Sequence, residues 1–193
     1  MIAAAALVAI VAGIVLVQAL SGGTPATGIT GTAGTTPSAS SQDARRQAAV
    51  RLDGLLAQSV TDRAAVTNAA EDVRGCGPSL HQDARTFARA ASSRQQLLSR
   101  LASLPGRSVL PAAMLRDLTS AWQASAQVDT DLSRWAQDNM TRGCRHHKDR
   151  SDAFLRASGG PEARATAGKR AFAALWNPIA RQYDLTTYQR DQL

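Results

Sequence analysis

The chain has 193 residues, with 22 Lys and Arg against 15 Asp and Glu, for a formal net charge of +7. An apolar start and an uncharged stretch after it leave about 150 residues, enough for one compact domain. All charged side chains lie from Asp43 onward, so the positive charge belongs to that domain. It favours anionic partners, or it only keeps the domain soluble. Aromatic residues make up only 4%, which excludes an aromatic-rich core.

The first twenty residues form an apolar segment. Residues 2–20 carry no charge and one polar side chain, Gln18. As a helix they would span about 28 Å, the thickness of the hydrocarbon core of a bilayer. We therefore predict a transmembrane anchor in residues 1–20. The alternative is a signal peptide cleaved near Ala19, because Val17-Gln18-Ala19 has the small-x-small pattern.

Residues 21–42 are built from Gly, Ser, Thr, Ala and Pro, with one Ile and no charge. Such a segment cannot bury enough apolar surface to offset its ordering entropy, so we expect a flexible linker. Neither flank of the apolar segment has a basic residue before Arg45, so charge does not orient the chain. The linker composition is typical of the stalks of exported proteins and favours a domain outside the membrane.

From Asp43 onward the apolar residues follow a helical period, and no run alternates as a half-buried strand does. Gly- and Pro-rich stretches should separate the helices, and short turns favour antiparallel neighbours. The sequence therefore predicts an all-α domain over residues 43–193, an up-down-up-down four-helix bundle. The expected helices span about 43–74, 79–104, from 109, and from 161; the expected breaks are 75–78, 104–106 and 158–161.

Two helix ends carry specific signals. Ser79 followed by Gln82 is a capping-box pattern and should open the second helix. The third helix ends either at Gly143 or as late as Ala157.

The last helix contains Pro178, which should kink it or split it at Asn177. The segment that follows, to Tyr188, should fold back on the bundle. Tryptophans at helical spacing are more often packed in a core than arranged along a ligand groove. We therefore expect the core to hold Trp122, Trp135 and Trp176.

The two cysteines should meet at one end of the bundle, opposite the entry of the chain. Cys76 ends the first helix and Cys144 lies near the end of the third, so we predict a disulfide between them outside the membrane. The alternative is a metal site that adds His81 and either His146 or His147 to the two sulfurs. The spacings are not those of standard zinc motifs.

A run of basic residues follows the third helix. It could bind an anionic envelope polymer, lipid headgroups or another envelope protein, or it could be a solvated helix end. Nucleic acid is not an expected partner, because no reading motif and no interleaved aromatic residues occur. We call this set the basic pole: Arg142, Arg145, His146, His147, Lys148 and Arg150.

The sequence shows no catalytic motif and no cofactor motif that we recognise. The order of anchor, linker and Arg- and Ala-rich helical domain resembles that of many exported proteins of high-GC Gram-positive bacteria. We therefore expect a single-pass, extracytoplasmic binding or interaction module of a bacterial cell envelope, without catalysis or cofactor. The alternatives are a secreted form and a metal-binding sensor that uses the Cys and His residues.

Overall fold

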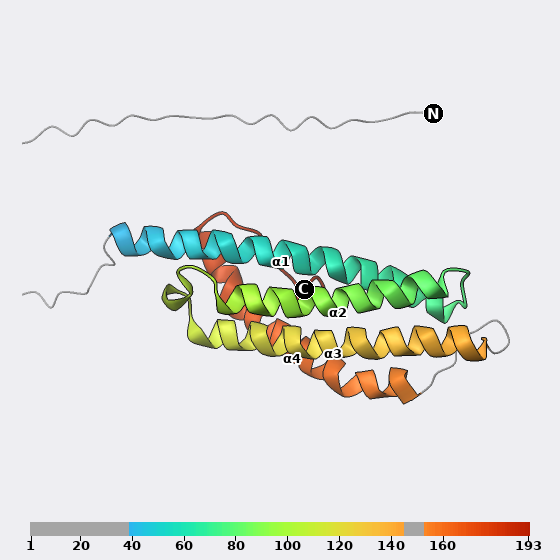
Figure 1. Ribbon diagram of the computed structural model, residues 1–193. Coiled ribbons are helices and arrows are strands. Elements are labelled where there is room, and N and C mark those ends of the chain that lie inside the picture. Colours follow the sequence, from blue (N-terminus) through green and yellow to red (C-terminus); the bar gives the residue numbers. More distant parts are fainter. Residues whose placement is uncertain (1–38, 145–152) are drawn as a thin grey trace, which may run out of the picture. The chain divides into compact units, whose positions relative to one another are not determined.

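The computed structural model describes residues 39–144 and 153–193, and in them it shows four long helices packed against one another (Figure 1). The helices are α1 (Ala39–Arg74), α2 (Leu80–Ala102), α3 (Ala112–Arg142) and α4 (Ala153–Gln182). One short 3-10 helix, η1 (Arg107–Val109), lies between α2 and α3. These two ranges contain no strand, so the predicted all-α class is confirmed for them.

Successive helices run in opposite directions, but α4 crosses the others obliquely instead of lying parallel to them (Figure 1). Helix α3 packs extensively against both α2 and α4, and α1 packs mainly against α2. Helices α1 and α4 have almost no direct contact with each other.

The helix starts differ from the sequence prediction in detail. Helix α1 ends at Arg74 as predicted, but it begins at Ala39, inside the predicted linker. Ser79 is the N-cap of α2, yet its side chain makes no capping bond, so the predicted capping box is wrong. The Ser79 amide instead donates to Oδ2 of Asp72 at 3.3 Å, because Asp72 reaches across the turn from α1. Gln82 uses its amide oxygen to accept a bond from Arg85.

Helix α3 ends at Arg142, and Gly143 follows it with a φ of 70°, so the earlier of the two predicted ends is correct. The predicted break at 158–161 is wrong, because α4 runs through it without interruption. A proline inside a helix removes one backbone hydrogen bond, and packing can outweigh that loss. Pro161 is buried, and the Ser158 hydroxyl donates to the Leu155 carbonyl at 2.7 Å.

Pro178 does not split α4, which continues to Gln182. The chain then reverses at Asp184, which has a φ of 55°. The amide of Leu185 donates back to the Ala180 carbonyl at 2.8 Å, which fixes the turn. The residues after it fold back on the helices, as predicted.

The apolar core has two parts. The larger gathers around Leu56, Trp122 and Trp176 and includes Tyr188 and Leu193 from the chain end. The smaller contains Phe87 and Trp135 and lies toward the opposite end of the bundle. The side chains of all three tryptophans are 0% exposed, so their predicted place in the core is confirmed.

Helices α3 and α4 come very close at Gly168. A Cβ atom there would lie 3.0 Å from the Asp117 carbonyl oxygen and 3.0 Å from the Ala121 Cβ. The absence of a side chain at this position lets the two helices approach each other.

No helix within residues 39–144 and 153–193 is both long and apolar enough to cross a membrane. The predicted anchor, residues 1–20, lies outside the described residues.

Candidate functional site

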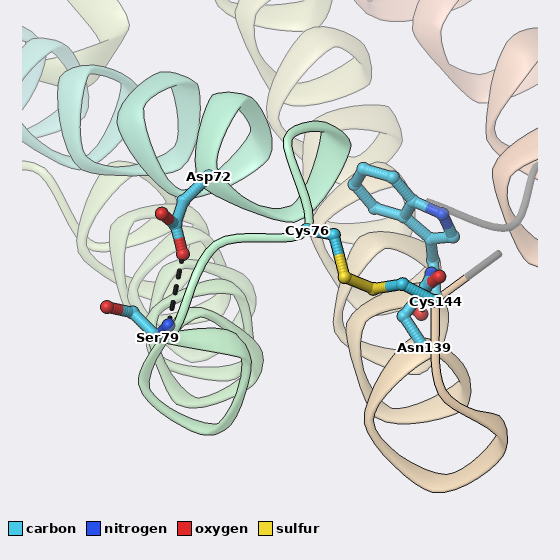
Figure 2. The surroundings of a disulfide bond; sticks show 6 residues. Asp72, Cys76, Ser79, Asn139 and Cys144 are labelled. Carbon is cyan, nitrogen blue, oxygen red and sulfur yellow. Dashed lines mark hydrogen bonds between the residues drawn. A yellow bond between two sulfur atoms is a disulfide. The ribbon is translucent and has the colours of Figure 1, made fainter. Parts of the chain in front are cut away.

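A disulfide joins Cys76 and Cys144, whose Cα atoms lie 6.1 Å apart (Figure 2). It connects the turn between α1 and α2 to the end of α3, so the predicted pairing is confirmed. Cys76 itself has a φ of 53°. In the next position, a Cβ at Gly77 would lie 1.8 Å from Oδ1 of Asp72, so the carboxylate occupies the space that a side chain would need.

The disulfide bears on the predicted metal alternative. Both sulfurs are bonded to each other, so neither is a free thiolate for a metal ion. The described ranges hold no group of three or more His, Cys, Asp or Glu side chains placed to bind a metal. His146 and His147 lie outside these ranges.

The basic pole is described at one residue only. Arg142, in the last turn of α3, forms an ion pair with Asp138 one turn earlier. The other five members lie in residues 145–150, outside the described residues. Anion binding by the basic pole therefore stays a prediction.

A cavity of about 470 Å³ opens between α1, α3 and α4, with Arg94 of α2 at its inner side. The apolar part of the lining consists of Val66, Val128, Leu132 and small alanine side chains. Three acidic groups also line it: Asp129, Glu162 and Asp191. Cationic side chains outnumber them among the described lining residues; they are Arg63, Arg74, Arg94, Lys169 and Arg190.

Charged groups beside this cavity lie deep inside the bundle. Arg94 is 2% exposed, Asp129 4% and Lys169 5%, although such residues are rarely buried. Together with Ser59 and Ser125 they form a layer that separates the two parts of the apolar core. We call these five residues the buried polar layer.

Arg94 connects three helices. Its Nη1 donates to the Ser59 carbonyl at 3.2 Å and also to the Ser59 hydroxyl. The indole Nε1 of Trp122 donates to the same hydroxyl at 3.1 Å. On its other side, Nε of Arg94 lies 3.9 Å from Oδ2 of Asp129. Helix α2 is thereby attached to α1 by hydrogen bonds and to α3 by a loose ion pair.

Several atoms of the buried polar layer have no hydrogen-bond partner. They are Nε of Arg94, Oγ of Ser125 and Oδ2 of Asp129, and all three residues line the cavity. A buried polar atom without a partner costs about 1–3 kcal/mol, and more when it is charged. Nε of Arg94 and the Ser125 hydroxyl are donors that an anion in the cavity would satisfy, whereas Oδ2 of Asp129 is an acceptor that faces Arg94.

Burial also shifts the ionisation of these groups. Desolvation raises the pKa of Asp129 to about 6, although Arg94 and Lys169 oppose the shift. Desolvation lowers the pKa of Lys169 to about 7, and the nearby Arg63 and Arg94 add to the shift. It also lowers the pKa of Arg94. An anion in the cavity would favour the charged forms of both cations.

The chain end forms one border of the cavity. We call residues 184–193 the C-terminal strap. Two of its residues, Arg190 and Asp191, line the cavity, and Nε of Arg63 donates to the Asp191 carbonyl. The strap therefore lies against the cavity on the side where α1 and α4 do not meet.

Sequence reasoning missed this site, although a signal was present. Arg94 falls in the apolar stripe of α2, between Ala91 and Leu97. Lys169 falls in the same way between Ala165 and Phe172 on α4. A charge on the apolar face of a helix indicates a buried ion pair or a functional group.

No known family model matches the chain, and neither a curated protein nor a solved structure shows significant similarity to it.

The first prediction concerns Arg94. Arg94→Met should lower the free energy of unfolding by about 3–5 kcal/mol at neutral pH, because it leaves Asp129 buried without its nearest cation. Adding Asp129→Leu should restore much of this loss, because the stranded charge is removed. Denaturant unfolding of the oxidised protein measures both. The exposed Arg89→Met on the same helix is the control and should change stability by about 0.5 kcal/mol or less. A double variant no more stable than Arg94→Met would contradict the ion pair.

The second prediction concerns pH. Asp83, buried beside Asp72, has its pKa raised to about 6 mainly by burial, as Asp129 has. The folded protein thus binds more protons than the unfolded chain between 3.8 and about 6, so stability should fall as pH rises through that window. Lys169 has its pKa lowered from 10.5 to about 7, so stability should rise again above about pH 7.

Denaturant unfolding at a series of pH values should therefore show a minimum of stability between about pH 6 and 7. Lys169→Met should abolish the alkaline rise, and Asp83→Asn should reduce the acid slope. The variant Arg170→Met, at an exposed neighbouring position, should keep both the fall in stability on the acid side and the rise on the alkaline side. An alkaline rise that persists in Lys169→Met would show that this lysine is not the group responsible.

Proposed function

We propose that this chain is a membrane-tethered, extracytoplasmic ligand-binding module of a bacterial cell envelope, which takes a small organic anion into the cavity between α1, α3 and α4. The observation that carries the proposal is the pair of buried cations, Arg94 and Lys169, beside unpartnered polar atoms in that cavity.

The charge of the lining supports an anionic ligand. Lys169 makes no ion pair within 4.0 Å with any described residue, and Arg94 is matched only by the loose contact to Asp129. An oxyanion between the two cations would accept charge-assisted hydrogen bonds, which contribute about 1.5–3 kcal/mol each. The other cations that line the cavity, Arg63, Arg74 and Arg190, would attract such a ligand.

The shape of the cavity supports a ligand with an apolar body. The lining includes the apolar side chains of Val66, Val128 and Leu132, and about 470 Å³ is room for more than an inorganic ion. Pockets for small molecules commonly combine an apolar lining with a few polar groups that orient the ligand. A carboxylate attached to an aromatic or aliphatic group fits this description.

Binding is better supported than catalysis. Ser125 and Lys169 line the same cavity, and a serine with a lysine of lowered pKa can act as nucleophile and base. Such a pair needs a hydrogen bond between the two groups, and the Ser125 hydroxyl makes none with any described residue. The cavity thus offers recognition groups without an activated nucleophile.

The disulfide supports a position outside the membrane. Disulfides persist in oxidising compartments and are rare in the bacterial cytoplasm. Residues 1–20 would hold the domain at the membrane as a single-pass anchor, and cleavage near Ala19 would instead release it.

The compartment is tested by thiol alkylation of the membrane-bound protein, with and without prior reduction, read by mass. We expect Cys76 and Cys144 to be labelled only after reduction. Labelling of both without reduction would place the domain in a reducing compartment and contradict an extracytoplasmic position.

The ligand class is tested with three probes of one shape: benzoate, benzamide and the benzamidinium cation. Titration calorimetry on the full chain in detergent should show benzoate binding more tightly than the other two. Lys169→Met should weaken the affinity for benzoate by about tenfold or more, because a charge-assisted hydrogen bond is lost. Arg170→Met, which removes a neighbouring exposed charge outside the cavity, should leave the affinity unchanged. Absence of benzoate binding, or equal binding of the cation, would overturn the proposal.

A further inference from the structure

Two features lie between α1 and α4. One is the C-terminal strap, whose Tyr188 is bonded to Asp53 of α1 and to Asn177 of α4, and the other is the cavity, which residues of both helices line. The two regions meet at Arg190 and Asp191, which belong to the strap and line the cavity. The strap therefore forms part of the wall of the binding site described above.

Specific side chains of α4 hold the middle of the strap. Nδ2 of Asn177 donates to the Tyr188 carbonyl at 3.0 Å, and the Tyr188 amide donates to Oδ1 of Asn177 at 3.0 Å. The indole Nε1 of Trp176 donates to the Thr186 carbonyl at 2.9 Å. The strap is neither helix nor strand, so these bonds replace a regular backbone ladder.

Helix α1 holds the strap from the other side. The Tyr188 hydroxyl donates to Oδ1 of Asp53 at 2.9 Å, and the Thr186 hydroxyl donates to Oδ2 of the same residue at 3.4 Å. Leu193 is 0% exposed and packs in the larger core. The strap thus bridges two helices that barely contact each other directly.

The start of the strap is built as a turn. Asp184 has a φ of 55°, a backbone conformation that costs a residue with a side chain some free energy. Beyond the turn, the strap is held mainly by side-chain hydrogen bonds and a few apolar side chains. Opening of such a segment leaves the backbone hydrogen bonds of the helices intact, so it costs less than global unfolding even though it exposes Tyr188 and Leu193.

The strap also positions a cation of the cavity. Nε of Arg63 donates to the Asp191 carbonyl, so the docked strap fixes the guanidinium at the cavity edge. The strap brings Arg190 to the same edge. Release of the strap would remove Arg190 and the Asp191 carboxylate from the site and would free Arg63 from its carbonyl partner.

We propose that the C-terminal strap closes the anion-binding cavity, and that strap docking and ligand binding stabilise each other through Arg63, Arg190 and Asp191. The inference rests on the proposed function, since it concerns the same cavity. The coupling is reciprocal by thermodynamic linkage: a ligand that contacts the docked strap favours docking, and a docked strap favours the ligand.

The first arm of the test measures hydrogen exchange of the Tyr188 amide in the full chain, with and without saturating benzoate. We expect benzoate to slow this exchange by several-fold, because the amide is protected only while the strap is docked. The Leu110 amide is the control, since it donates to the Arg107 carbonyl in η1, outside the cavity lining. Benzoate should slow exchange of the Leu110 amide by no more than it slows exchange of the helical amides.

The second arm measures benzoate affinity in two strap variants. Asn177→Ala removes both hydrogen bonds to Tyr188 and lies outside the cavity lining. It should weaken the affinity for benzoate by several-fold. Thr187→Ala alters an exposed strap residue whose side chain has no hydrogen bond to any described residue, and this variant should bind benzoate like the wild type.

The two proposals fail in different ways. If the wild type does not bind benzoate, the proposed function itself is wrong. If it binds benzoate but Tyr188 exchange and the affinity of Asn177→Ala are both unchanged, the cavity binds anions and the strap does not close it. Faster Tyr188 exchange with benzoate would show that the ligand displaces the strap, which also overturns the inference.

Discussion

The placement of one arginine inside the bundle governs much of this structure. Arg94 lies where an apolar residue would continue the core, and it is held there by the carbonyl and hydroxyl of Ser59. Burying a guanidinium is costly unless its donors are satisfied, and here the pairing with Asp129 is loose. The core is therefore divided into two apolar parts with the buried polar layer between them. The cavity lies at this layer, so the buried polar atoms that lack hydrogen-bond partners belong to residues that line it.

The oblique course of α4 has a second consequence. A bundle of four parallel-packed helices would place the fourth against the first, whereas α4 packs on α3 and leaves α1 uncovered along one side. The C-terminal strap fills part of this opening with Tyr188 and Leu193. At the opposite end the disulfide joins the α1–α2 turn to the end of α3 (Figure 2). The strap and the disulfide thus connect helices whose mutual packing is incomplete.

The charges and the lining of the cavity support the proposed binding of an organic anion. A preorganised pair of buried cations favours an oxyanion, since the cost of burying the charges is met during folding and not during binding. The apolar part of the lining favours an organic ligand over a bare ion.

The sequence by itself determined the helical class, the Gly75–Pro78 and Leu104–Gly106 turns, the end of the first helix at Arg74 and the pairing of Cys76 with Cys144. The helices and turns could be predicted because the spacing of apolar residues and the turn-forming residues are local signals. The cysteine pairing could be predicted because the similar lengths of the first and third helices bring both cysteines to the same end of the bundle. Tertiary structure decided that α4 runs through Gly159, Gly160 and Pro161, because packing outweighs the local tendency to break. It also decided that Arg94, Asp129 and Lys169 surround one cavity. They lie on α2, α3 and α4, and no local pattern encodes the oblique course of α4.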